Sequence, residues 1–214
     1  MNNYFNYNDY RIRKLSLDET VKSFNCGDAD LNDFIINDAN NYRKSLLAVT
    51  YVFEHNTTGD IIAYFSLAND RVSLSDFKDK TEFNRFRKSR FVNEKRIKSY
   101  PAVKICRLGV SEKMKGFGIG SVLLAFIKSF FLIDNKTGCR FITVDAYSDA
   151  ISFYERNNFQ HLRNDDEPQN IVTHLLYYDL NDIAWLGTNV YGNVPKTSRS
   201  DAKKRRNDTP SLHH

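Results

Sequence analysis

Apolar residues recur at helical spacing in the middle of the chain. They stand at positions 119, 122, 123, 126, 127 and 130, which is the stripe of an amphipathic helix packed on a sheet. Immediately before it, a short apolar run ends at Val110, and a polar turn with three glycines follows. The pattern therefore predicts a strand, a glycine turn and a helix in direct succession.

The other apolar runs predict a mixed sheet with helices on both of its faces. The second and third runs are joined by HNTTGD with Gly59 in the turn, which indicates a β-hairpin. The central helix connects two strands, and such a crossover joins parallel strands. The expected strands are Arg11–Leu15, Ala48–Glu54, Ile61–Leu67, Ala102–Val110, Phe141–Ala146 and Thr173–Leu180, and the other expected helices are Asp28–Tyr42, capped by Asp28 or Asp30, and Asp149–Asn157. The predicted fold class is α/β.

Between Asp70 and Tyr100 the pattern breaks, and we expect an ordered basic insertion with a short helix. Arg71–Lys98 carries ten Lys and Arg residues against four Asp and Glu, a balance of +6. Phenylalanines at 77, 83, 86 and 91 are interleaved with these cations. Two interpretations are open. Either the phenylalanines of a solvated helix dock on the core, or cations neutralise nucleic-acid phosphates while aromatic rings stack on bases.

The chain of 214 residues suits one domain, 1–193, and a basic tail, 194–214. The tail is nearly free of large apolar residues, so it is expected to be disordered. A net charge of +5 is compatible with an acidic partner. Three cysteines without metal-ligand spacing indicate a reducing compartment. No apolar run reaches the ~18 residues of a membrane span. The start of the sequence is too polar for a signal peptide. We expect a cytoplasmic protein without membrane contact.

The glycine turn has the chemistry of an anion site. The first amides of a helix lack carbonyl partners and carry the positive end of its dipole, so a phosphate binds well there. Gly116, Gly118 and Gly120 keep side chains away from those amides, and Lys115 adds positive charge. The spacing fits neither a P-loop, which needs Lys-Ser/Thr after the last glycine, nor the G-x-G-x-x-G dinucleotide fingerprint.

Two motifs resemble those of the GNAT superfamily of acetyl-CoA-dependent N-acetyltransferases. Lys115-x-x-Gly118-x-Gly120 resembles the Q/R-x-x-G-x-G/A pyrophosphate loop, with lysine in the first position. The stretch Ala150–Phe159 resembles the family's second signature, A-x-x-F-Y-E-R/K-x-G-F, with Asn158 in place of glycine. Asn158 is expected to adopt a left-handed conformation after the helix end, which asparagine tolerates.

The resemblance implies a GNAT-like sheet whose two parallel strands splay apart to admit the pantetheine of acetyl-CoA. Leu108 and Val110 would offer backbone groups to the pantetheine. Tyr154 would sit at the thioester sulfur as general acid, because a phenol with a pKa of ~10 can protonate a departing thiolate. No general base is assigned, since the central strand offers only Lys104 and Arg107. The residues expected to hold the pyrophosphate are Lys115, Gly116, Phe117, Gly118, Ile119, Gly120 and Ser121.

Within the superfamily, the stretches around Cys26, GDIIAYFSLA and YPAVKICRLGV look like the acetyltransferase toxins of bacterial toxin–antitoxin modules. That branch acetylates the amino group of aminoacyl-tRNA, is neutralised by ribbon-helix-helix antitoxins and is often dimeric. The resemblance thus makes tRNA, bound through residues 71–98, an antitoxin and a second copy the candidate partners. Open alternatives are acetylation of a small-molecule amine or a protein N-terminus, a non-catalytic acyl-CoA-binding module, and nucleic-acid binding without acetyl-CoA.

Other reactive side chains receive structural interpretations. His161 and His174 have no ligand-spaced partner, so no metal is expected. Cys106 lies on the central strand without a histidine in an identifiable relation to it, and we expect a buried small hydrophobic residue there.

Overall fold

A computed structural model describes residues 5–91, 97–133, 137–163 and 173–182. The chain divides into two units, Met1–Leu180 and Asn181–His214. Nearly all described residues belong to the first unit, which contains all the strands and helices named below. The expected boundary at residue 193 and the tail 194–214 lie outside the described residues.

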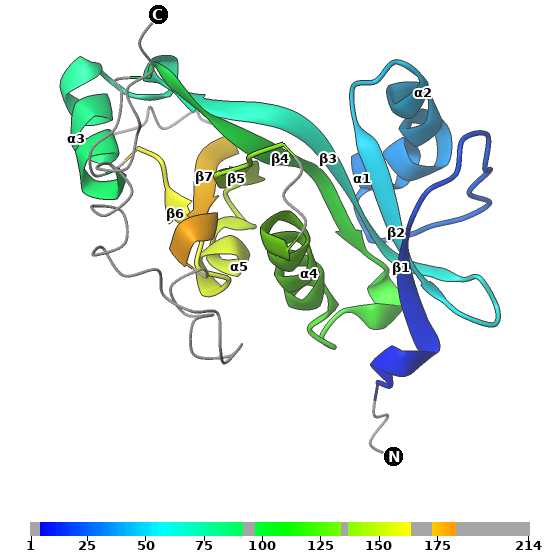
Figure 1. The fold of residues 1–214 in the computed structure, drawn as a ribbon. Helices are drawn as coiled ribbons and strands as arrows, with labels where there is room; N and C mark the ends of the chain where they lie inside the picture. The colour runs from blue at the N-terminus through cyan, green and yellow to red at the C-terminus, as the bar shows by residue number, and fades with distance from the viewer. Residues whose placement is uncertain (1–4, 92–96, 134–136, 164–172, 183–214) are drawn as a thin grey trace, which may run out of the picture. The chain divides into compact units, whose positions relative to one another are not determined.

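The described residues form one seven-stranded sheet in the order β1-β2-β3-β4-β5-β7-β6 (Figure 1). All neighbouring strands are antiparallel except β4 and β5, which run parallel as the crossover predicts. The mixed α/β fold class is therefore confirmed. The strands are β1 Tyr10–Lys14, β2 Val49–His55, β3 Ile61–Ser73, β4 Ser99–Val110, β5 Phe141–Tyr147, β6 Gln160–His161 and β7 Thr173–Asp179. The helices are α1 Ala29–Asp33, α2 Ala39–Lys44, α3 Lys80–Arg90, α4 Ile119–Ile133 and α5 Ile151–Arg156.

The six predicted strands are all present, each within a few residues of its expected limits except for the end of β3. The expectation that the pattern breaks at Asp70 is wrong, because β3 continues to Ser73 and pairs with the start of β4, with Ser73 opposite Ser99. The two-residue strand β6 was not predicted, since so short a segment has no periodicity to read.

The first predicted helix is divided in three. Asp28 caps α1 by accepting a hydrogen bond from the Leu31 amide at 3.0 Å, which confirms one of the two expected caps. A wide π-helical turn, Phe34–Asp38, then separates α1 from α2. This irregular turn still places Phe34 and Ile35 in the core.

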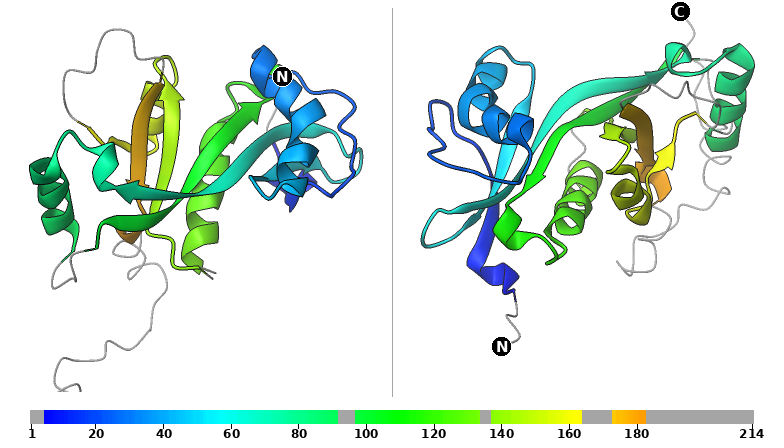
Figure 2. Two further views of the ribbon diagram at one scale, coloured as in Figure 1. Left: turned by 90° about the horizontal axis from the view of Figure 1, so that it is seen from above. Right: turned by 180° about the vertical axis from the view of Figure 1, so that it is seen from behind.

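Helices cover both faces of the sheet (Figures 1 and 2). Neighbouring residues of a strand point to opposite faces. On β3, Tyr64 stacks on Phe34 at 6.3 Å between ring centroids, whereas Phe65 packs on Phe126 of α4 at 6.1 Å. The segment Ala29–Lys44 therefore lies on one face and α4 on the other, as predicted.

The buried stripe of α4 is rotated from the predicted one. Ile119, Leu123 and Ile127 are buried as expected, but Phe130 is 41% exposed while Leu124 and Lys128 are buried. Among the described residues, no helix has the length and apolar character needed to cross a membrane.

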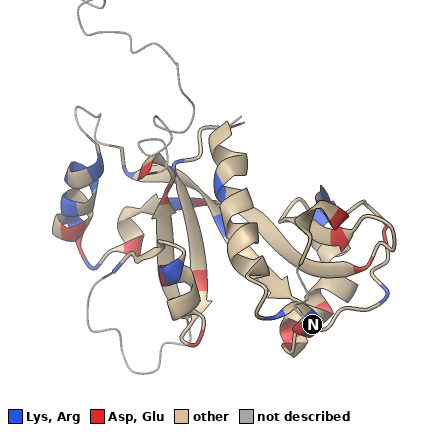
Figure 3. Cartoon of the chain, turned by 90° about the horizontal axis from the view of Figure 1, so that it is seen from below, with Lys and Arg blue, Asp and Glu red and all other residues tan. Residues whose placement is uncertain are grey.

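The α3 helix docks on the sheet through its aromatic residues. Phe77 and Phe83 are buried, and Phe86 lies 5.7 Å from Phe141 and 5.4 Å from Tyr177 between ring centroids. The first interpretation of the insertion is therefore supported for its phenylalanines, because Phe77 and Phe83 are buried and the half-buried Phe86 and Phe91 pack against them and the sheet. The exposed surface of α3 is rich in Lys and Arg (Figure 3).

The β4 and β5 strands separate after a short paired stretch. Only Ala102–Lys104 pairs with Phe141–Thr143. In the pairing of β4 with β3, Ile105 and Arg107 face consecutive residues, so Cys106 forms a bulge. A bulge bends its strand and increases the local twist, and this one lies where β4 leaves β5.

Candidate active site

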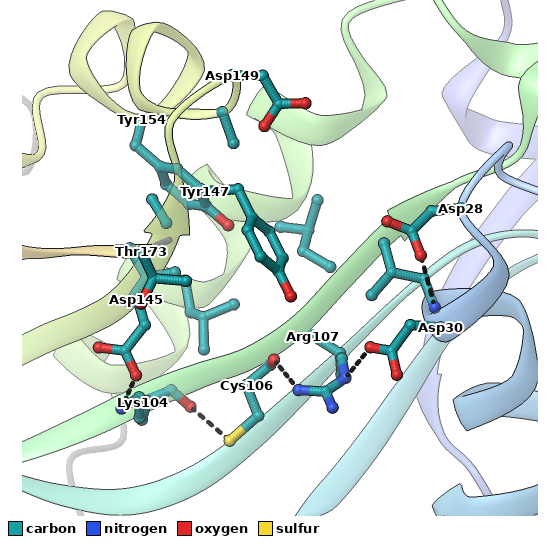
Figure 4. A pocket seen from close by; sticks show the side chains of 16 residues that line it. Asp28, Asp30, Lys104, Cys106, Arg107, Asp145, Tyr147, Asp149, Tyr154 and Thr173 are labelled. Carbon is teal, nitrogen blue, oxygen red and sulfur yellow. Dashed lines mark hydrogen bonds and ion pairs between the residues drawn. The ribbon is translucent and has the colours of Figure 1, made fainter. Parts of the chain in front are cut away.

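A cavity of about 720 Å³ occupies the gap between the separated strands (Figure 4). Tyr154 reaches it from α5, which lies on the α4 face of the sheet, and Asp30 and Leu31 reach it from α1 on the other face. The cavity therefore passes through the sheet. The remaining lining residues are Asp28, Lys104, Ile105, Cys106, Arg107, Leu108, Val144, Asp145, Ala146, Tyr147, Asp149, Ala150 and Thr173.

Tyr154 points its hydroxyl into this cavity (Figure 4). The residue is only 7% exposed, and its hydroxyl makes no hydrogen bond within the described part of the chain. Burial disfavours the charged phenolate and raises the pKa of Tyr154 to about 12. The hydroxyl is thus protonated at neutral pH and free to donate a hydrogen bond to a molecule in the cavity.

The turn after α5 confirms the expectation for Asn158. This residue has φ 64°, the left-handed conformation that the substitution of asparagine for glycine predicts. The following amide, that of Phe159, donates to the carbonyl of Tyr154 at 3.0 Å, and the ring of Phe159 packs against Tyr154 at 5.4 Å. The second signature therefore closes the helix end directly behind Tyr154.

A second cavity of about 550 Å³ lies over the glycine turn and shares Leu31 and Leu108 with the first. Gly116 has φ 86° and Gly118 has φ 73°, and a Cβ at either position would meet nothing within 4 Å. The backbone there is open to a ligand. The further lining residues are Cys26, Gly109, Val110, Met114, Lys115, Ile119, Gly120, Ser121, Phe153 and Arg156.

Three residues near this second cavity add to or depart from the expected arrangement. Phe117 does not line the cavity and is 38% exposed. A Cβ on Gly120 would lie 3.0 Å from the ring of Phe153, so this glycine also allows α4 to approach α5. Arg156 of α5 faces the glycine turn and was missed, because its position in the second signature gives no hint that α5 packs there.

The Lys115 side chain is turned toward Gly27, in the loop that precedes α1. Its Nζ lies 3.1 Å from the position that a Cβ on Gly27 would take, and Glu112 Oε1 lies 2.8 Å from the same point. The Glu112 carboxylate also accepts a hydrogen bond from Asn25 Nδ2 at 2.9 Å. Lys115 thus stands at the edge of the cavity beside a carboxylate.

The backbone of Leu108 and Val110 faces the gap. The amide of Ser111 donates to Ile62 O of β3 at 2.8 Å. Because backbone groups alternate in direction along a strand, those of Gly109 also face β3, and those of Leu108 and Val110 face away from it. The structure therefore brings these two residues, the open glycines and Tyr154 to two adjoining cavities that share Leu31 and Leu108.

The charged residues of the first cavity are largely paired. Lys104 of β4 forms an ion pair with Asp145 of β5 across the gap, and Arg107 Nε lies 3.5 Å from Asp30 Oδ2. Burial lowers the pKa of Lys104, but the hydrogen bond and charge of Asp145 outweigh it and leave the pKa raised. Lys104 is therefore a cation at neutral pH and a poor base.

Cys106 is half-buried and lines the first cavity, so the expectation of a buried residue is wrong in degree. Burial still raises the pKa of its thiol above the usual value, which disfavours the nucleophilic thiolate. His161 Nε2 lies 3.4 Å from Glu155 Oε1, and His174 Nε2 lies 3.4 Å from Ser148 Oγ. Among the described residues, no group of three or more potential metal ligands is found.

Comparisons with known proteins agree with this geometry. AtaT complexed with acetyl-methionyl-tRNAfMet superposes with a TM-score of 0.67 at 20% identity, covering 83% of this chain and 99% of AtaT. A tyrosine-to-phenylalanine mutant of KacT superposes with a TM-score of 0.66 at 20% identity, again over 83% and 99%. At this identity the likeness establishes the fold. No curated protein sequence matches the chain significantly.

The family described as acetyltransferase (GNAT) domain matches residues 48–161, more than half of the chain. This range contains both the glycine turn and the α5 signature. The chain therefore belongs to the GNAT family of acetyltransferases.

Proposed function

We propose that this acetyltransferase transfers acetyl from acetyl-CoA directly to the amino group of an aminoacyl-tRNA. The observation that carries the proposal is the cavity that passes through the sheet. Tyr154 lines it on one face, and Asp145 and Tyr147 line it on the face on which α3 lies. The cavity over the open glycine turn adjoins it at Leu31 and Leu108. Acetyl-CoA and a large acceptor can therefore approach the same point from opposite sides.

The acceptor side of the cavity and α3 lie on the same face of β5. Phe141, which contacts α3, alternates with Thr143, Asp145 and Tyr147 along one face of the strand. Tyr147 is six positions after Phe141 along the strand, which corresponds to roughly 20 Å. No described residue of the insertion lines the cavity, so the cations of α3 would hold the body of the acceptor while its end enters the gap.

In the proposed reaction, the glycine turn holds the pyrophosphate and the backbone of Leu108 and Val110 holds the pantetheine. The acceptor nitrogen attacks the thioester carbonyl, a C–N bond forms and the C–S bond breaks. Tyr154 donates its proton to the departing sulfur, and the proton that the acceptor nitrogen releases passes to water, from which Tyr154 regains its own. A phenol with a pKa near 12 is a weak acid, but a thiolate leaving into the same poorly hydrated space is correspondingly more basic.

Three solved neighbours support the choice of acceptor and partner. One structure is AtaT with acetyl-methionyl-tRNAfMet. Another is a tyrosine-to-phenylalanine mutant of AtaT with acetyl-CoA and the C-terminus of the antitoxin AtaR. The third is a complex of KacTA with DNA. These ligands and partners are those of AtaT and KacT. By analogy, a neutralising antitoxin is a further prediction for this chain.

A small-molecule amine is the second candidate acceptor. The rim of the cavity carries Asp28, Asp30 and Asp149, and carboxylates attract a protonated amine but repel a polyanion. Transfer to a panel of small amines in preference to charged tRNA would select this candidate.

The test measures transfer of labelled acetyl from acetyl-CoA to bulk aminoacyl-tRNA, beside deacylated tRNA and small amines. For Tyr154→Phe we expect turnover to fall by ~10²-fold or more with acetyl-CoA affinity unchanged, because only the proton donor is removed. Since the pKa of Tyr154 is about 12, we also expect no loss of wild-type turnover from its ionisation below about pH 11. An unchanged rate in the variant would remove Tyr154 from the mechanism.

A further inference from the structure

Lys128 is a buried lysine in the middle of the α4 face that packs on the sheet. The residue is only 7% exposed. Within the described part of the chain, no carboxylate pairs with it. Burial lowers the pKa of its ammonium to about 8. A buried cation without a counter-ion destabilises a fold, so the contacts that it does make are informative.

All of these contacts lie at the C-terminal end of α5 and the strand beside it. Lys128 Nζ donates to the carbonyl of Asn157 at 2.5 Å, the residue that ends α5. The same nitrogen lies 3.8 Å from the ring centroid of Tyr178 and 5.3 Å from that of Phe159. A cation is favourable at this end of a helix, where carbonyls lack partners and the dipole is negative, and aromatic faces attract it as well.

Lys128 is one point at which α4 contacts the end of α5. Gly120 is another point of contact between the two helices, where the ring of Phe153 would lie 3.0 Å from an added Cβ. Gly120 and Lys128 are eight residues apart on α4, and they meet α5 at Phe153 and Asn157. Tyr154 stands between these two positions, and its carbonyl accepts hydrogen bonds from the amides of Asn157 at 2.9 Å and Phe159 at 3.0 Å.

We propose that Lys128 is a positioning residue that fixes the C-terminal turn of α5 and thereby aims the Tyr154 hydroxyl at the reacting sulfur. The helix α5 has only six residues, too few to hold its own geometry. The orientation of α5 therefore depends on the contacts at its two ends. The inference rests on the proposed role of Tyr154 as proton donor.

The test compares Lys128→Met, which keeps the length of the side chain but removes the donor and the charge, in two backgrounds. In the otherwise wild-type protein we expect turnover with aminoacyl-tRNA to fall about 10-fold or more, with the KM for acetyl-CoA changed less than twofold. In the Tyr154→Phe background, the same substitution should change turnover less than twofold, because the group that Lys128 aims is already absent. The same fold-loss in both backgrounds, or no loss in the first, would overturn the proposal.

Thr50→Val is the matched control. Thr50 is buried and donates to Ser66 Oγ at 3.2 Å on the neighbouring strand β3, remote from α5. It should lower stability without this selective loss of turnover. The single variant Tyr154→Phe separates failure of the proposed role of Tyr154 from failure of the proposed role of Lys128. If Tyr154→Phe retains full activity, the proposed role of Tyr154 is wrong. If Tyr154→Phe loses activity and Lys128→Met does not, only the proposed role of Lys128 is wrong.

Hydrogen exchange of the peptide spanning residues 150–159 gives a readout that needs no acceptor. Lys128→Met should speed exchange there, because the last turn of α5 loses the hydrogen bond from Lys128. Thr50→Val should leave exchange of that peptide unchanged. Equal exchange in wild type and Lys128→Met would contradict the proposal even if no acceptor were found.

Discussion

The glycine turn and the α3 helix are both positively charged regions suited to phosphates, yet they are built in opposite ways. At the turn, the backbone is open: Gly116 and Gly118 have positive φ and empty space where a side chain would project. At α3, the cations Lys80, Arg85 and Lys88 are on exposed side chains, whereas Phe83 is buried and Phe86 is half-buried. Backbone amides select one phosphate group in one geometry, whereas mobile side chains attract any polyanion.

This difference predicts that the turn determines cofactor affinity and α3 determines only electrostatic attraction. The buried phenylalanines of α3 should contribute to stability and not to recognition. Variants at Phe83, at Gly118 and at the exposed cations of α3 test these assignments separately, beside the Tyr154 and Lys128 variants.

The largest effect is expected for Phe83→Ala. Phe83 is 5% exposed and packs against Phe77 at 5.3 Å between ring centroids. Truncation of a buried phenylalanine costs about 3–5 kcal/mol of unfolding free energy, measurable by urea denaturation. Binding of tRNA per folded molecule should be unchanged. Unaltered stability with weaker tRNA binding would restore the base-stacking interpretation of the insertion.

The next effect is expected for Gly118→Asp, compared with Gly59→Asp. Both glycines have positive φ and open surroundings, so the strain of substitution is similar. A carboxylate about 6 Å from a phosphate at an effective dielectric constant of about 20 costs roughly 3 kcal/mol. We therefore expect acetyl-CoA to bind Gly118→Asp ~10²-fold more weakly by calorimetry and to bind Gly59→Asp normally. Equal affinities would show that the turn is not the phosphate site.

The smallest effect is expected for Lys80, Arg85 and Lys88 changed together to Gln, which preserves helix propensity. All three side chains are exposed. Each lost phosphate contact reduces the slope of log affinity against log salt by about 0.7–0.9, so the slope for tRNA should fall by about 2–3. The KM for tRNA should rise about 10-fold at low salt while that for acetyl-CoA stays constant.

Lys22→Gln, which removes one exposed cation from outside the insertion, is the control for this charge change. If the triple variant retains the full salt slope, α3 does not contact the acceptor. The small-amine candidate would then become the stronger of the two.

The sequence by itself determined the fold class, six of the seven described strands, the parallel pair and the left-handed Asn158. These features follow from local rules: apolar periodicity, crossover connections and the few residues that tolerate positive φ. The two GNAT motifs also lie within one stretch of chain each, so they could be read without knowing what packs on them.

Only the tertiary structure decided how these parts are used. The Cys106 bulge lies where the sheet opens, and α3 packs Phe83 in the core. Gly120 leaves room for the ring of Phe153, and Lys128 donates to the carbonyl at the end of α5. Each of these depends on contacts between residues distant in sequence, and a lysine within an apolar helical stripe looks like a solvated residue until its partner is known. Periodicity reports which face of an element is buried, but it does not report what that face meets.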